Sequence, residues 1–197
     1  MDIRKIITGL TLSLLLGSGV AVAADFNKGL EAAQSGNFKT ALAEWTPLAE
    51  QGHALAQYNL GILYQFGNGV PKNAKTALKW YLKAAEQGHA GSQWRSGVYY
   101  DVGVGVLEND KIAVRWFTLA AEQEYAFAQL SLAGMYIKGS GVLKDKRRAY
   151  MWLSLAGYNG QDIVEIKDEI TMMMTPADIS KAQDMSSRCL ESNYTDC

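Results

Sequence analysis

Residues 54–89 of this 197-residue chain read ALAQYNLGILYQFGNGVPKNAKTALKWYLKAAEQGH, and residues 90–125 read AGSQWRSGVYYDVGVGVLENDKIAVRWFTLAAEQEY. The two stretches align without a gap and are identical at 15 of 36 positions. A third copy, AFAQLSLAGMYIKGSGVLKDKRRAYMWLSLAGYNG, occupies residues 126–160. Self-similarity at a fixed period of roughly 20–50 residues indicates a repeat architecture, in which stacked neighbours bury a continuous core.

Each unit carries the hydrophobic pattern of two helices. In the first copy, Ala56, Leu60 and Tyr64 lie on one helical stripe, and Ala77 and Ala84 belong to a second stripe. A shorter, degenerate unit precedes this copy. The sequence therefore predicts an all-α fold, a row of helix-turn-helix units at residues 25–53, 54–89, 90–125 and 126–160.

Two glycines mark the turn inside every copy, Gly67 and Gly69 in the first. A glycine directly after a helix commonly takes the left-handed conformation that satisfies the last carbonyl groups. A phosphate-binding loop would need a preceding strand, a third glycine or a Gly-Lys-Ser/Thr ending, and no copy has one. We interpret the glycines as helix ends, each followed by an N-cap residue: Asn73, Asn109 and Asp145.

Gly61 and Gly97 lie in the middle of the first helix of their units. Glycine at such a position costs about 1 kcal/mol relative to alanine. We expect close approach of a neighbouring helix to compensate, with Ala133 at the same position of the third copy.

Residues 1–24 have the order of a secretory signal. Arg4 and Lys5 precede an apolar stretch over residues 6–16, and small residues then allow cleavage at Ala23 or Ala24. Retention as an anchor is the alternative, because residues 6–24 are nearly long enough to span a bilayer. Cleavage predicts a periplasmic or secreted protein with no stable membrane insertion.

Cys189 and Cys197 are the only cysteines of the chain. In an exported protein we expect them to form an intramolecular disulfide that pins the tail to the last helix. An intermolecular bridge or two reduced thiols are the alternatives.

Few residues of this chain are candidates for catalysis or metal binding. His53 and His89 are the only histidines, and they occupy the same repeat position, so they should lie one unit apart rather than share a metal or catalytic site. The chain lacks the common nucleophile and zinc-protease motifs. Its formal net charge of −1 provides no electrostatic footprint for nucleic acid. We therefore expect a protein without enzymatic activity, cofactor or nucleic-acid partner.

The pattern AxAQxxLGxxYxxGxGVxxNxxKAxxWxxKAAEQG, which the copies follow from residue 54 to about 160, resembles the Sel-1-like repeat (SLR), a relative of the tetratricopeptide repeat. The resemblance implies a right-handed α-solenoid that usually serves as an adaptor for other proteins, without catalytic residues. Some secreted members of the family bind or hydrolyse penicillin-like compounds. Those members carry cysteine pairs in repeat after repeat, whereas this chain has a single pair at its C-terminal end. Binding of β-lactams or cell-wall fragments, with weak hydrolase activity, is therefore only the alternative function here.

In helix-pair solenoids the first helix of each repeat lines the concave face. We expect this face to bind a protein or an extended peptide of the cell envelope. Tyr58 and Trp94 are equally compatible with packing between repeats, whereas Arg95 and Asp101 are stronger candidates for exposure because charged residues are seldom fully buried. The predicted groove residues are Tyr58, Asn59, Ile62, Gln65, Trp94, Arg95, Val98, Asp101 and Leu130.

Residues 161–197 predict a capping helix pair and a tail. A first helix at residues 161–174 would turn Val164, Ile170 and Met174 toward the stack. Thr175 and Pro176 then form a typical helix start. The following helix would place Ile179, Ala182 and Cys189 near one face. Such an end element stops end-to-end stacking of a solenoid.

Overall fold

The structure is a computed structural model that describes residues 24–195 and 197, and every helix or strand in this part of the chain is an α-helix. Residues 1–23 of the predicted signal segment lie outside the described residues. The helices are α1 (Phe26–Gln34), α2 (Phe38–Glu50), α3 (Ala54–Phe66), α4 (Ala74–Glu86), α5 (Ala90–Val102), α6 (Asp110–Ala121), α7 (Ala126–Lys138), α8 (Lys146–Tyr158), α9 (Val164–Met172) and α10 (Pro176–Glu191).

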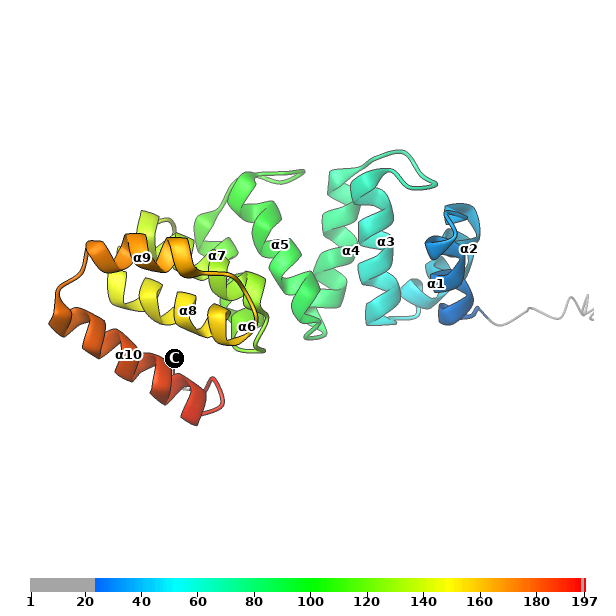
Figure 1. The fold of residues 1–197 in the computed structure, drawn as a ribbon. Helices are drawn as coiled ribbons and strands as arrows, with labels where there is room; N and C mark the ends of the chain where they lie inside the picture. The colour runs from blue at the N-terminus through cyan, green and yellow to red at the C-terminus, as the bar shows by residue number, and fades with distance from the viewer. Residues whose placement is uncertain (1–23, 196) are drawn as a thin grey trace, which may run out of the picture.

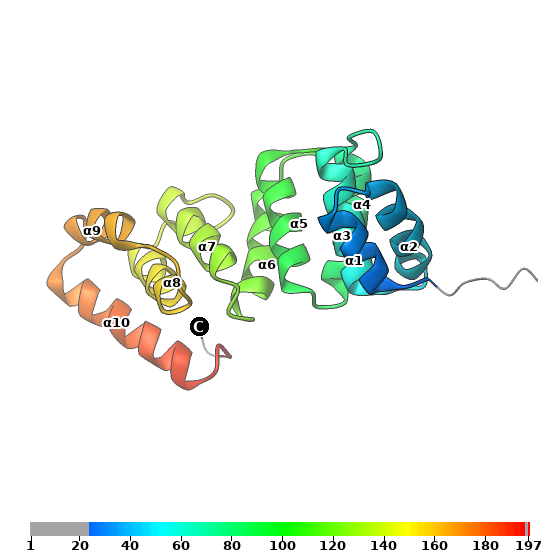
Figure 2. The same cartoon turned by 45° about the vertical axis from the view of Figure 1, so that its right-hand side comes forward.

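The helices form antiparallel pairs that stack in chain order (Figure 1). Each helix from α2 to α8 packs on the helix before it and the helix after it, and α10 packs on α8. A view turned by 45° shows the same row, closed at its C-terminal end by α9 and α10 (Figure 2). The predicted all-α repeat solenoid is therefore confirmed.

The glycines in the middle of the first helices lie against an aromatic ring of the second helix. A Cβ atom on Gly97 would lie 2.5 Å from Cε1 of Phe117, and one on Gly61 would overlap the ring of Tyr81. The expected close approach of the neighbouring helix is confirmed, and the part of that helix that lies against each glycine is an aromatic side chain. In the third unit the corresponding residues are Ala133 and Leu153, which lie in one buried cluster.

The turns also follow the prediction. The first glycine of each turn adopts the left-handed backbone conformation, with φ of 78° at Gly67, 71° at Gly103 and 79° at Gly139. The next helix is capped in every copy, since Asn73 accepts from the Thr76 N–H at 2.9 Å and the other two caps act likewise through Asn109 and Asp145.

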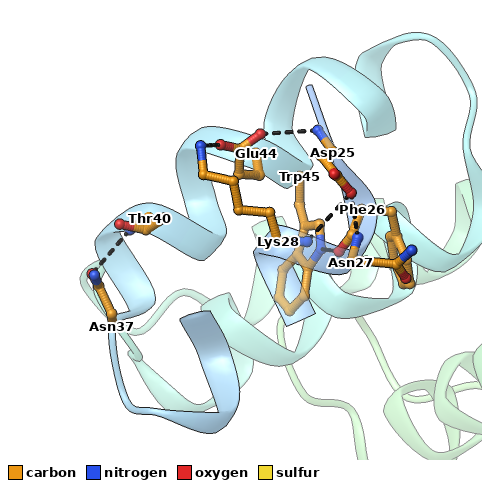
Figure 3. A network of polar contacts seen from close by, with 8 residues as sticks. All are labelled: Asp25, Phe26, Asn27, Lys28, Asn37, Thr40, Glu44 and Trp45. Carbon is orange, nitrogen blue, oxygen red and sulfur yellow. Dashed lines mark hydrogen bonds and ion pairs between the residues drawn. The ribbon is translucent and has the colours of Figure 1, made fainter. Parts of the chain in front are cut away.

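A polar network joins the two helices of the N-terminal unit (Figure 3). The buried Glu44 of α2 accepts a hydrogen bond from the backbone N–H of Asp25 at 2.9 Å and forms an ion pair with Lys28. These contacts hold the pKa of Glu44 below its usual value, with the Lys28 hydrogen bond as the main cause. Trp45 donates from Nε1 to the Phe26 carbonyl at 3.1 Å. The start of α1 is thereby fixed on α2.

A second set of side-chain contacts recurs every 36 residues, and sequence reasoning missed it. Gln57 donates to the Ala49 carbonyl of the preceding unit at 2.9 Å and accepts from Gln87 at 2.7 Å. We call this set the glutamine ladder; its later members are Gln93 with Gln123, and Gln129 with Asn159.

The C-terminal segment confirms most of the predicted orientations. The disulfide Cys189–Cys197 is present, and Ala182 is buried in the same core cluster as Cys189. However, α9 begins at Val164 instead of residue 161, since Asp162 accepts from the Val164 N–H at 3.3 Å. Val164 is 67% exposed, so its predicted inward orientation is wrong.

The other predicted core contacts of this segment are present. Ile170 is buried, and Met174 and Ile179 pack against the C-terminal core.

Candidate protein-binding groove

Aromatic side chains of three successive units gather along the first helices. The ring centroid of Tyr58 on α3 lies 4.6 Å from that of His89, at the start of α5. The ring of Trp94 on α5 lies 5.9 Å from Tyr125 and 5.4 Å from Phe127, at the start of α7. We call these five residues the groove cluster. Aromatic residues of this kind dominate the energetics of protein interfaces.

Trp94 packs across a unit boundary on Phe127. Tyr58 instead contacts His89, at the end of its own unit, and part of each ring is exposed. Trp94 donates from Nε1 to the hydroxyl of Ser131 at 3.1 Å. Trp94 therefore packs between repeats and still keeps part of its ring exposed. Phe127 is 49% exposed and extends the aromatic surface onto α7.

Arg95 carries the charge beside this cluster. Its guanidinium carbon lies 4.8 Å from the Trp94 ring centroid, and its Nε is buried without a hydrogen-bond partner among the described residues. Burial raises the pKa values of Tyr99 and Tyr125, and the nearby charge of Arg95 opposes that rise. The cation therefore lies next to an indole and acts electrostatically on two tyrosine hydroxyls.

Asp101, the other charged residue predicted for the groove, has a different environment. It is partly buried, and burial raises its pKa, while Lys138 of α7 opposes the rise. Asp101 thus has a cation of its own chain nearby.

The remaining predicted groove residues are partly buried. The polar end of Gln65 is engaged within the unit, because it accepts from the Tyr81 hydroxyl at 2.5 Å. Ile62 packs against the core of the second unit, and Val98 and Leu130 pack against the C-terminal core. Asn59 is partly exposed on the same helix as Tyr58.

Sequence reasoning missed three members of the groove cluster, His89, Tyr125 and Phe127. His89 and Tyr125 lie 36 residues apart, each at the end of its unit and directly before the first helix of the next one. The repeat register was the available signal, because it places both residues at the same corner of successive units.

Each histidine caps a helix. His53 accepts through Nδ1 from the Ala56 N–H at 3.2 Å, and His89 accepts through Nδ1 from the Ser92 N–H at 3.1 Å. Burial lowers the pKa of His89. Within residues 24–195 and 197, no three His, Cys, Asp or Glu side chains are grouped to hold a metal ion. None of the helices in that range has the length and apolar character needed to cross a membrane.

Comparison with known proteins identifies the repeat. The family model of the Sel1 repeat matches residues 54–89, 90–125 and 126–161. A Sel1 repeat protein from Oxalobacter formigenes is 35% identical over 70% of this chain, with a TM-score of 0.67. A protective antigen with an SLR fold, present in uropathogenic Escherichia coli strains, is 26% identical over 86% of this chain, with a TM-score of 0.53.

The matched parts are 56% of the Oxalobacter chain and 46% of the Escherichia coli chain. The search of curated proteins found no match. Because the three matched repeats cover more than half of its residues, the chain belongs to the Sel1 repeat family.

Proposed function

We propose that this protein is an exported adaptor that binds an extended segment of a cell-envelope protein in its concave groove and acts by binding rather than catalysis. The groove cluster is the observation that carries this proposal, because three units contribute partly exposed rings to one surface. Sel1 repeat proteins are generally scaffolds for protein interactions, which is consistent with this role.

Export is supported by the disulfide between Cys189 and Cys197, since such bonds persist mainly in oxidising compartments. We further propose cleavage after Ala24, because the nitrogen of Asp25 lies 2.9 Å from a carboxylate oxygen of the buried Glu44. Cleavage there would turn this nitrogen into an ammonium group paired with that carboxylate.

Mass spectrometry of the protein purified from the envelope fraction tests both parts. A chain that begins at Asp25 is the expected result. A chain that still begins at Met1 would contradict cleavage of a signal, and one that begins at Ala24 would contradict the choice of site.

Site-specific photocrosslinking tests the groove. A benzophenone amino acid is placed at Leu55 or Phe127, which are exposed and occupy the same repeat position. Matched controls carry it at Lys79 and Arg115, equivalent exposed positions on the second helices α4 and α6. We expect the groove positions to crosslink one shared envelope protein. That protein is then purified, and the Kd of its complex with this chain is measured. Crosslinks to the same protein from the controls alone would place binding outside the groove.

A further inference from the structure

We propose that Arg95 is the specificity-determining residue of the groove and pairs with the carboxylate of an Asp or Glu side chain in the bound segment. An apolar residue next to that acid would contact Trp94, Tyr125 and Phe127. This inference rests on the proposed function, because it names the chemistry of the segment that the groove binds.

The first argument is the charge of Arg95, which is not balanced within the chain. The ion pairs among the described residues are formed by Lys28, Arg147 and Arg148, and no described carboxylate lies within 4.0 Å of Arg95. Asp101 on the same helix interacts with Lys138 instead.

Arg148 shows how an arginine beside a ring is satisfied elsewhere in the same fold. Its guanidinium lies 5.6 Å from the Tyr136 ring centroid, donates to the Tyr136 hydroxyl at 3.0 Å and lies 3.9 Å from an oxygen of Asp145. Arg95 has the ring contact but neither a hydroxyl nor a carboxylate partner among the described residues. The two arginines therefore share the ring contact, but only Arg148 also has a hydroxyl and a carboxylate nearby.

The second argument is the surroundings of Arg95. Its Nε is excluded from solvent, and the ring of Trp94 lies against the guanidinium. A carboxylate pairs more strongly with a partly desolvated cation than with a fully hydrated one, and a planar guanidinium can bind both carboxylate oxygens. The rings beside it supply apolar contact for the neighbouring residue of the segment.

The third argument concerns which carboxylate is bound. The predicted groove residues lie on both sides of Arg95 in chain order, with Tyr58 and Asn59 on α3 and Leu130 on α7. A segment that contacts all three first helices would pass over Arg95, so an internal acidic side chain fits better than a chain end. A nucleic acid would require several phosphate-binding cations, whereas the groove cluster has one arginine beside it and the chain has a net charge of −1.

The experiment selects peptides with the full-length disulfide-bonded protein. A library of fully randomised linear peptides, about twelve residues long and with both ends blocked by fusion, is panned on the wild type and on Arg95→Gln, Arg95→Glu and Arg148→Gln. We expect wild-type peptides to be enriched in Asp or Glu next to an aromatic or aliphatic residue. Arg95→Gln should lose the acidic preference and keep the apolar one, Arg95→Glu should select Lys or Arg, and Arg148→Gln should behave as the wild type.

Binding constants then test the pairing. For one selected peptide, replacing its acid by the amide should weaken binding by about tenfold or more to the wild type, and much less to Arg95→Gln. Thermal melting and circular dichroism establish that each variant is folded.

The outcomes separate this inference from the proposed function. Peptides without acidic preference, or a preference that survives Arg95→Gln, would overturn the role of Arg95 and leave the groove intact. Binding that requires a free peptide C-terminus would assign the carboxylate to a chain end and overturn the side-chain assignment. If photocrosslinking also finds no groove partner, failure to select any peptide would count against the proposed function itself.

Discussion

Within a single unit, the space around one residue explains a sequence difference between the copies. Gly97 is required because the Phe117 ring occupies the space of a Cβ atom. In the third unit Ala133 replaces the glycine and Leu153 replaces the ring. The sequence predicted close approach at this glycine, but it did not identify the ring, because the pairing depends on how the two helices face each other.

We predict that Gly97→Ala destabilises the protein by about 1–3 kcal/mol, because the added methyl group overpacks the contact with Phe117. Adding Phe117→Leu should recover part of the loss, since this pair reproduces the third unit. Equilibrium urea unfolding measures both variants. A Gly97→Ala protein as stable as the wild type, or a double variant less stable than either single one, would contradict this account.

His89 predicts a pH dependence of stability. Its Nδ1 accepts from the Ser92 N–H, which only the neutral imidazole can do, and burial lowers its pKa below 6.5. Because the unfolded chain binds the proton more readily, the contribution is complete above about pH 6.5 and is lost as the pH falls toward the lower folded-state pKa.

The unfolding free energies at about pH 7.5 and pH 5.5 measure this effect. His89→Asn keeps a capping side chain but does not titrate in this range, so its stability should change less between the two values. An equal change in wild type and variant would show that His89 is not the titrating group.

At the scale of helices, the repeat period and the turn chemistry predicted the pairs, their caps and the left-handed glycines. The glutamine ladder was not predicted, because a buried glutamine in one sequence copy does not show which carbonyl of the preceding unit it reaches. The start of α9 and the exposure of Val164 were missed for a related reason. No repeat register extends beyond residue 161, so local apolar spacing alone assigned the inward side.

We predict that Gln93→Leu destabilises the protein by about 1–3 kcal/mol. Gln93 is buried, donates to the Ala85 carbonyl at 3.2 Å and accepts from Gln123 at 2.7 Å, so its loss leaves polar groups without these partners. Gln51→Leu is the control, because Gln51 is exposed and occupies the position of Gln123 in the N-terminal unit. Urea unfolding compares the two. Equal effects would mean that the ladder contributes nothing specific to stability.

For the whole molecule, the solenoid followed from the repeats, but the groove cluster did not. Tyr58 and Tyr125 belong to different units. Burial is the main cause of the raised pKa of Tyr125, and the charge of Tyr58 raises it further. Their proximity depends on how neighbouring units pack, which no single copy encodes. For this reason the sequence proposed positions on the first helices and missed the aromatic residues at the unit corners.

The C-terminal disulfide connects the tail to the ladder of the last unit. Tyr194 lies between Cys189 and Cys197, and its hydroxyl accepts a hydrogen bond from Asn159 at 2.9 Å. We therefore predict that Cys197→Ser costs about 2–3 kcal/mol of stability and frees Tyr194 from this contact.

The loss should remain at one end, because each unit of a solenoid contacts only its neighbours. Hydrogen exchange measured segment by segment should show faster exchange in α8 and α10 and unchanged exchange in α1–α4. Tyr194→Phe keeps the disulfide and removes the hydroxyl, so it separates the covalent link from the hydrogen bond. Faster exchange throughout all ten described helices would instead mean that the array unfolds as one cooperative unit, and that the tail stabilises every repeat equally.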